Sequence, residues 1–135
     1  MSNKIFIDTL FVVALINQRD EYHEKAIELS NIYEGASLIT SDVVLLEIGN
    51  ALARNFKKEA IQIIDDFLSS SDVEIVRITP LLFERAYSIY KQYYDKDWGL
   101  IDCVSFAIMK EKAVKKALTF DQHFIQAGFL SLMRH

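Results

Sequence analysis

The chain has 135 residues, 51% of them hydrophobic, with a net charge of −4 and only one proline, four glycines and one cysteine. This length and composition predict a single domain over residues 1–135 with a sizeable core, and they exclude a disordered chain and an internal disulfide. The negative charge argues against non-specific duplex binding. Because no apolar run approaches the ~20 residues that span a bilayer, and no secretory signal opens the chain, we expect a cytoplasmic protein without a membrane partner.

The first half of the chain alternates short apolar runs with helical patterns. The run at residues 4–7 is β-branched and aromatic, which predicts a buried strand. Ser41 and Asp42 are good helix caps, and Gly35 is typical of a helix end. In chain order we predict a strand at residues 4–7, helices at 9–18 and 21–34, a strand at 37–40, and helices at 43–55 and 58–70.

The second half continues the alternation. Thr79 followed by Pro80 is a strong helix start. The predicted elements are a strand at residues 73–78, helices at 80–94 and 100–111, a strand at 116–120, a helical turn at 121–126 and a strand at 129–133. Strands separated by helices indicate a three-layer α/β/α sandwich with a mainly parallel sheet. In such sheets the functional site lies at the carboxyl ends of the strands.

Two aspartates close predicted strands at that edge. Asp8 follows the first strand, and Asp121 follows the strand at residues 116–120. Each aspartate taken alone is well explained as the cap of the helix after it.

Two further acids lie in very apolar helical segments. Glu47 shares a helix face with Arg54, so an ion pair between them is one explanation, and metal binding is the other. Asp102 lies near the start of an apolar helix, where the helix dipole favours a negative charge. Carboxylates that gather at one place repel one another, and a hard cation such as Mg²⁺ or Mn²⁺ is the usual reason for gathering them.

Other chemistry finds less support. The glycines are scattered, and no Cys/His set suits zinc. His23 and His123 are expected to be structural or surface residues. A phosphatase with Asp8 as nucleophile would want a second acid where the chain has Leu10. Four tyrosines follow a helical spacing that favours a core or partner surface over base stacking: Tyr87, Tyr90, Tyr93 and Tyr94. We expect that helix, together with the helix at residues 9–18, to meet a second copy of the chain.

Five segments, in order, resemble motifs of the PIN-domain family. They are residues 5–9 (IFIDT), 20–26 (DEYHEKA), 46–52 (LEIGNAL), 97–106 (DWGLIDCVSF) and 119–124 (TFDQHF), the last followed by 127–129 (AGF). With the short length, they make the chain similar to the VapC-like toxins of toxin–antitoxin pairs. The resemblance implies a PIN-like fold, a homodimer and an antitoxin protein as partner.

The resemblance also implies an activity and a site. The activity is Mg²⁺- or Mn²⁺-dependent hydrolysis of RNA phosphodiester bonds, and the catalytic and metal-binding residues are Asp8, Glu47, Asp102 and Asp121, with Asp8 and Asp102 as the firmest ligands. The family often has serine and threonine where this chain has Gly99 and Ile101. The alternative is therefore a catalytically weakened PIN-like domain that acts as a binding or regulatory partner.

Overall fold

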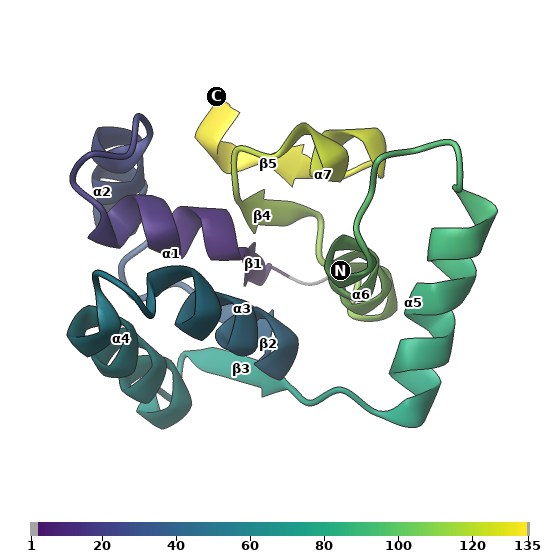
Figure 1. The fold of residues 1–135 in the computed structure, drawn as a ribbon, viewed down its shortest axis with the longest axis horizontal. Coiled ribbons are helices and arrows are strands. Elements are labelled where there is room, and N and C mark those ends of the chain that lie inside the picture. The colour runs from purple at the N-terminus through teal and green to yellow at the C-terminus, as the bar shows by residue number, and fades with distance from the viewer. Residues whose placement is uncertain (1–2, 135) are drawn as a thin grey trace.

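Five short parallel strands form the centre of the molecule (Figure 1). The structure, a computed structural model, describes residues 3–134, so the first two residues and the last residue of the expected domain lie outside the described part. The strands lie in the order β3-β2-β1-β4-β5. Their bounds are β1 (Ile5–Ile7), β2 (Leu38–Ser41), β3 (Val73–Val76), β4 (Lys116–Leu118) and β5 (Leu130–Ser131).

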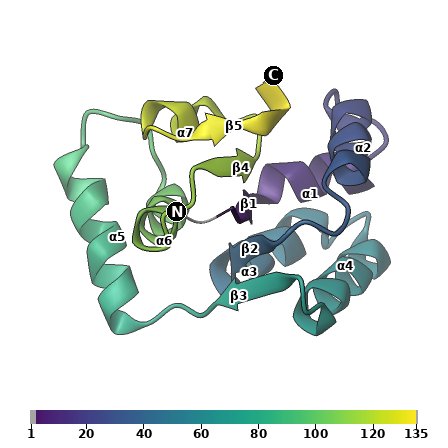
Figure 2. The ribbon, with the colours of Figure 1, turned by 180° about the vertical axis from the view of Figure 1, so that it is seen from behind.

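Helices connect each strand to the next, because parallel strands cannot be joined by tight turns. The connections are α1 (Thr9–Ile16) and α2 (His23–Ile32), α3 (Asp42–Leu52) and α4 (Lys57–Ser69), α5 (Pro80–Gln92) and α6 (Leu100–Glu111), and α7 (Gln122–Gln126). Figures 1 and 2 show α1, α2 and α4 on one side of the stacked strands, with α5 and α6 on the other. The predicted three-layer, parallel α/β architecture is confirmed.

The central strand explains why the sheet needs both layers. All three residues of β1 are buried, and Phe6 is completely so. β1 pairs with β2 on one side and with β4 on the other. A strand that is covered on both faces in this way reads as a continuous apolar run, which the sequence shows at residues 5–7.

A row of packed aromatic rings holds α6 and α7 against β1. The ring of Phe106 on α6 meets that of Phe124 on α7 edge to face at 5.0 Å between centroids, and Phe124 lies 6.4 Å from Phe6 on β1. Trp98, just before α6, packs on Phe106 at 5.1 Å. These contacts set the positions of α6 and α7 relative to the carboxyl end of β1.

The structure corrects two expectations. The predicted last strand at residues 129–133 is only Leu130–Ser131, because a 3-10 helix (Leu132–Arg134) turns the chain back and Met133 N–H donates to the Thr119 carbonyl at 3.1 Å. The helices α1 and α5 were expected to share one partner surface, which is wrong, since both views place them on opposite sides of the sheet.

Candidate active site

Asp8 leaves β1 as a buried carboxylate at the carboxyl edge of the sheet. Its side chain is only 6% exposed. Although Asp8 stands at the N-cap position of α1, its carboxylate makes no hydrogen bond to that helix. It instead accepts a hydrogen bond from the Thr119 hydroxyl, with 2.8 Å between Oγ1 and Oδ2. Helix capping therefore does not explain Asp8.

Thr119 joins the ends of the two neighbouring strands β1 and β4. While its hydroxyl donates to Asp8, the same oxygen accepts the backbone N–H of Asp121 at 3.0 Å. This bond turns the backbone out of the ladder after Leu118 and directs Asp121 toward the site. Sequence reasoning gave Thr119 no role, and the available signal was a hydroxyl residue directly after a buried strand.

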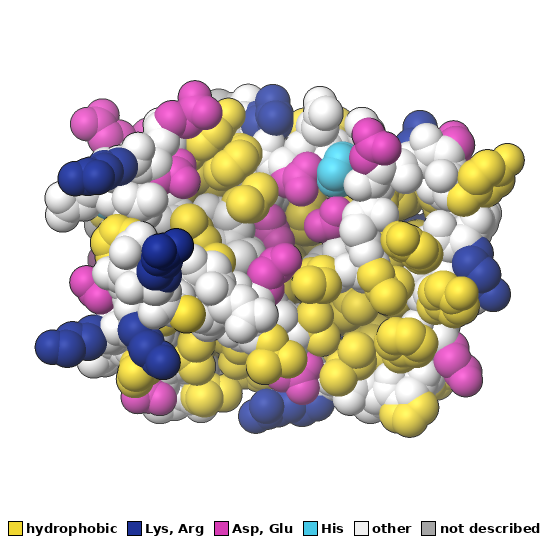
Figure 3. Space-filling view, viewed as in Figure 1, with side chains coloured by type: hydrophobic (Ala, Val, Ile, Leu, Met, Phe, Trp, Pro, Cys, Tyr) yellow, Lys and Arg dark blue, Asp and Glu magenta, His cyan; other side chains and the backbone are white. Residues whose placement is uncertain are grey.

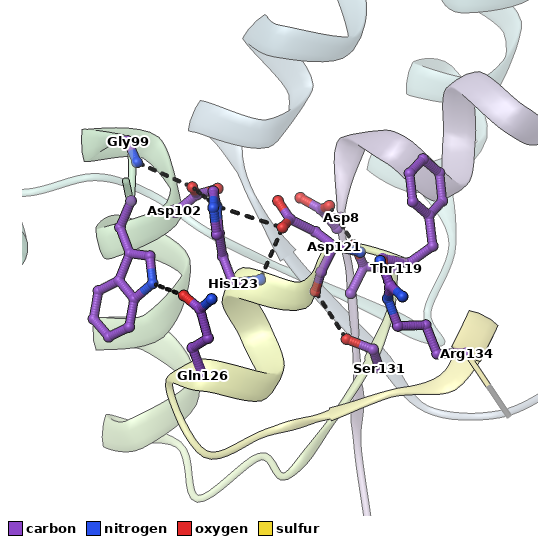
Figure 4. Close-up of polar contacts among 11 residues, drawn as sticks. Asp8, Gly99, Asp102, Thr119, Asp121, His123, Gln126, Ser131 and Arg134 are labelled. Atoms are coloured by element: carbon purple, nitrogen blue, oxygen red, sulfur yellow. Dashed lines mark hydrogen bonds and ion pairs between the residues drawn. The ribbon is translucent and has the colours of Figure 1, made fainter. Parts of the chain in front are cut away.

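Asp102 and Asp121 both cap helices and both face the site. The Asp102 Oδ2 atom accepts the Gly99 N–H at 3.1 Å, and Asp121 Oδ1 accepts the His123 N–H at 2.8 Å. Helix capping thus explains one contact of each acid, but each also has a contact that capping does not explain. The His123 ring lies between them (Figure 4), with Nδ1 3.2 Å from Asp102 Oδ2 and 3.4 Å from Asp121 Oδ1. His123, expected to be structural or on the surface, is part of the cluster.

Glu47 approaches the same cluster from α3. Its half-buried carboxylate accepts a hydrogen bond from the hydroxyl of Thr9, the first residue of α1. The expected alternative, an ion pair with Arg54, is absent from the described part of the chain. Arg54 lies seven residues further along, just past the end of α3, and the Glu47 carboxylate is instead held by the hydrogen bond from the Thr9 hydroxyl.

The electrostatics show that the four acids converge. The pKa of Asp8 is raised to about 7, mainly by burial; the hydrogen bond from Thr119 opposes this shift, and the charges of Asp102, Glu47 and Asp121 add to it. Burial also raises the pKa of Asp102, with Asp121 adding to it and the bonds from Gly99 and His123 opposing it. Because Asp102, Glu47 and Asp121 all act on Asp8, the four carboxylates share one neighbourhood, and their roles as catalytic and metal-binding residues stay predictions.

Among the described residues, no lysine or arginine pairs with these carboxylates, and His123 is the basic side chain that contacts two of them. Within residues 3–134, every ion pair of a lysine or arginine involves another acid. Figure 3 shows the acidic side chains gathered at the middle of one face, beside a histidine. Ligand atoms of Asp102, Asp121 and His123 all lie within 4.8 Å of one another. A set of mostly oxygen donors, partly buried and without a lysine or arginine partner, suits a hard divalent cation.

The positions that depart from the family pattern are occupied differently here. Gly99 contacts Asp102 through its backbone N–H, and a Cβ built at Gly99 would lie 3.8 Å from Asp102 Oδ2, which is an ordinary contact. Ile101 is 37% exposed. Hydroxyl groups reach the acids from Thr9 and Thr119 instead. The site therefore keeps hydroxyl donors, although they come from other elements.

Known proteins resemble this chain over nearly its whole length. A profile of the PIN domain family matches residues 5–130. The chain is 30% identical over 128 residues to the 23S rRNA-specific endonuclease VapC20 of Mycobacterium tuberculosis, covering 95% of this chain and 97% of that protein.

Solved structures agree at the level of the fold. The crystal structure of Mycobacterium tuberculosis VapC20, described as a sarcin-ricin loop cleaving toxin, aligns with a TM-score of 0.85 and 31% identity over 93% of this chain and 96% of that chain. A toxin–antitoxin complex from Klebsiella pneumoniae aligns with a TM-score of 0.66 and 14% identity, over 95% and 97% of the two chains. The match along nearly the whole length, with the acids placed at the carboxyl edge of a parallel sheet, shows that this chain belongs to the PIN domain family.

Proposed function

We propose that this protein is a metal-dependent endoribonuclease, the toxin of a toxin–antitoxin pair, with residues 1–135 as a single catalytic domain. One observation carries the proposal: Asp8, Glu47, Asp102 and Asp121 converge at the carboxyl edge of the sheet, and among the described residues none of them pairs with a lysine or arginine. The similarity to a 23S rRNA-specific endonuclease over nearly the whole chain supports RNA as the substrate class. An enzyme that acts on cellular RNA would work in the cytoplasm.

The four acids would hold one or two Mg²⁺ or Mn²⁺ ions. A bound divalent ion supplies a Lewis acid that offsets the charge on the attacked phosphodiester and activates water for hydrolysis. Thr119 keeps Asp8 and Asp121 at a fixed separation, and Thr9 orients Glu47. His123 Nδ1, 3.2 Å from Asp102 Oδ2, orients that carboxylate.

Cleavage of single-stranded RNA by the purified chain tests this function. We expect cleavage with Mg²⁺ or Mn²⁺, none with a chelator, and a loss of at least about 100-fold for Glu47→Gln, since a ligand is removed without changing the side-chain size. Sequencing the RNA ends formed on expression without a partner would identify the target. Equal cleavage by wild type and Glu47→Gln would contradict the proposal.

The alternative function is a PIN-like domain that binds RNA or protein without cutting. Gly99 and Ile101 are the observation that favours it, since they replace hydroxyl residues of the family pattern. A wild-type chain that cuts no RNA, whereas Gly99→Ser cuts with metal, would support this alternative. The space at Gly99 admits that serine.

We also propose two partners, a second copy of the chain and an antitoxin. Exposed apolar side chains lie on α3 and the first half of α5, among them Leu46 (70% exposed), Leu81 (55%) and Phe83 (45%), and Figure 3 shows hydrophobic side chains gathered over this part of the face. Such surfaces mark protein contacts. An antitoxin segment would cover the acids, with a lysine or arginine in place of the cation. Light scattering checks the dimer, which Phe83→Glu should dissociate.

Among the described residues no helix is long and apolar enough to cross a membrane.

A further inference from the structure

A groove of about 590 Å³ opens beside the acidic cluster, between the end of α5 and the loop that leads to α6. Its walls carry the rings of Tyr87, Tyr90 and Tyr94. Neither the cluster of acids nor the exposed apolar residues of α3 and the first half of α5 line it. The groove is a separate feature whose position relative to the acids can be followed residue by residue.

One wall of the groove contains a residue that contacts the acidic cluster. Gly99 lines it and also donates its backbone N–H to Asp102 Oδ2 at 3.1 Å. Trp98, another lining residue, is 7% exposed and is held by a hydrogen bond from its indole N–H to Gln126 Oε1 at 2.9 Å. Its ring also packs on Tyr93 at 4.9 Å. The wall of the groove at Trp98 and Gly99 is therefore held in place next to Asp102, so a ligand in the groove would lie beside the acidic cluster.

The tyrosine rings face solvent. Tyr94 is 87% exposed, and Tyr87 and Tyr90 are 43% and 44% exposed, so of the two expectations for this helix, core and partner surface, the core does not hold for these three rings. Tyr87 and Tyr90 stack with 6.3 Å between their centroids. Exposed rings that form the wall of a groove, beside a site for phosphodiester chemistry, are suited to stacking on nucleobases.

The charge of the groove has the opposite sign to that of the chain. Lys91 and Lys96 line it against one acid, Asp97, which gives a local charge of +1 where the whole chain carries −4. Lys91 lies 4.7 Å from the centroid of Tyr87. The side chain of Lys96 forms no ion pair with any described residue. The cores of protein–protein interfaces are depleted in lysine, so a second copy of the chain fits this groove less well than a polyanion does.

We propose that this groove is a subsite for a nucleotide that flanks the cleaved phosphodiester of a single-stranded RNA. Its base stacks on Tyr90 and Tyr94, and Lys96 neutralises a phosphate of the same strand. This assignment rests on the RNA-cleaving function proposed above, and it adds the part of the chain that holds the substrate strand. Because every base has a face that can stack, the subsite favours unpaired RNA rather than one sequence.

Binding of a short, labelled single-stranded RNA tests the subsite, with Glu47→Gln as the background so that the RNA stays intact. Tyr94→Ala should weaken binding about 5- to 150-fold, as expected for the loss of one stacked base, and Tyr94→Phe should bind nearly as the background does. Ile61→Ala is the control: this side chain is 54% exposed on α4 and lies outside both the groove and the proposed partner surface, so RNA affinity should stay unchanged.

A second measurement tests the phosphate contact. Lys96→Gln should reduce the slope of log affinity against log salt concentration by about 0.7, the value for one phosphate contact on a single strand. Lys115→Gln, at the opposite edge of the sheet before β4, should leave that slope unchanged.

Four outcomes would overturn the subsite: no RNA binding by the background, unchanged affinity of Tyr94→Ala, an equal loss in Ile61→Ala, or a Tyr94→Ala chain that becomes a monomer and regains RNA affinity at high protein concentration. The last would assign the groove to a second copy. Because binding is measured without cleavage, failure of the nuclease assay is distinguishable from failure of the subsite.

Discussion

At the scale of single residues, the site depends on hydroxyl groups as much as on acids. Thr119 is completely buried, and its one oxygen serves both Asp8 and Asp121. Residues that orient metal ligands in this way typically change metal affinity 10- to 100-fold, on the order of the effect of a ligand itself. A threonine that touches no substrate is therefore expected to matter for metal binding.

We predict that Thr119→Val weakens metal binding, because valine keeps the shape but leaves Asp8 without its donor and the Asp121 N–H without its acceptor. The Mn²⁺ concentration at half-maximal thermal stabilisation should rise about 10- to 100-fold. Thr119→Ser, which retains the hydroxyl, should stay close to wild type. A valine variant that titrates like wild type would show that Thr119 is only a packing residue.

The buried carboxylate of Asp8 predicts a pH dependence of stability in the metal-free protein. Its pKa is about 7 in the folded chain and 3.8 as the ordinary value, so the folded state holds the proton more tightly. The free energy of unfolding should therefore be highest below about pH 4 from this group, and should fall by up to about 4 kcal/mol as pH rises to about 7.

Urea unfolding in a chelator across this pH range measures the effect. Asp8→Asn removes the titrating group and should flatten the profile, since asparagine still accepts the bond from Thr119. An identical fall in the variant would assign the pH dependence to other groups.

At the scale of elements, each helix start near the site has two roles. The first turn of α6 carries Asp102, whose carboxylate satisfies the free N–H of Gly99 while it faces Asp121 and His123. The first turn of α7 is built in the same way around Asp121. Helix starts and clustered acids are compatible because unpaired N–H groups and the helix dipole favour negative charge at these points.

Asp102→Asn separates these two roles. Asparagine retains an oxygen for the Gly99 N–H but removes one of the repelling charges, so the metal-free variant should melt no lower than wild type and should lose cleavage. Asp102→Ala also removes the cap and should lose roughly 1 kcal/mol of stability. Thermal melting with a chelator compares the three proteins. A large loss in the asparagine variant would mean that capping alone explains this residue.

At the scale of the whole molecule, the fold holds acids together that would otherwise repel, and a bound cation should repay that cost. A ligand that binds only the folded state stabilises it by about 2.7 kcal/mol at about 100 times its dissociation constant. Millimolar Mg²⁺ or Mn²⁺ should thus raise the melting temperature of wild type by several degrees. Asp8→Asn should gain clearly less, and an equal gain would remove Asp8 from the set of ligands.

Much of this molecule is predictable from local pattern. The helix at residues 100–111 matches α6 (Leu100–Glu111), and every predicted helix and strand has its counterpart. The positions of Asp8 and Asp121 at one edge follow from the strands that precede them. The errors lie where the chain departs from regular periodicity, as at the short β5 and its 3-10 helix, because tertiary hydrogen bonds to Thr119 decide the conformation there.

The sequence by itself determined the layered α/β architecture and the four acids, because apolar periodicity and strand ends are local properties of the chain. The tertiary structure decided which groups surround those acids. Thr119 and Asp8 lie 111 residues apart, and Glu47 accepts a hydrogen bond from Thr9 rather than pairing with Arg54, which lies just past the end of α3. It also decided that three tyrosines of α5 and the turn after it face solvent, since only packing against α6 fixes which side of α5 is covered. Such contacts join elements that are remote in sequence, and no periodicity encodes them.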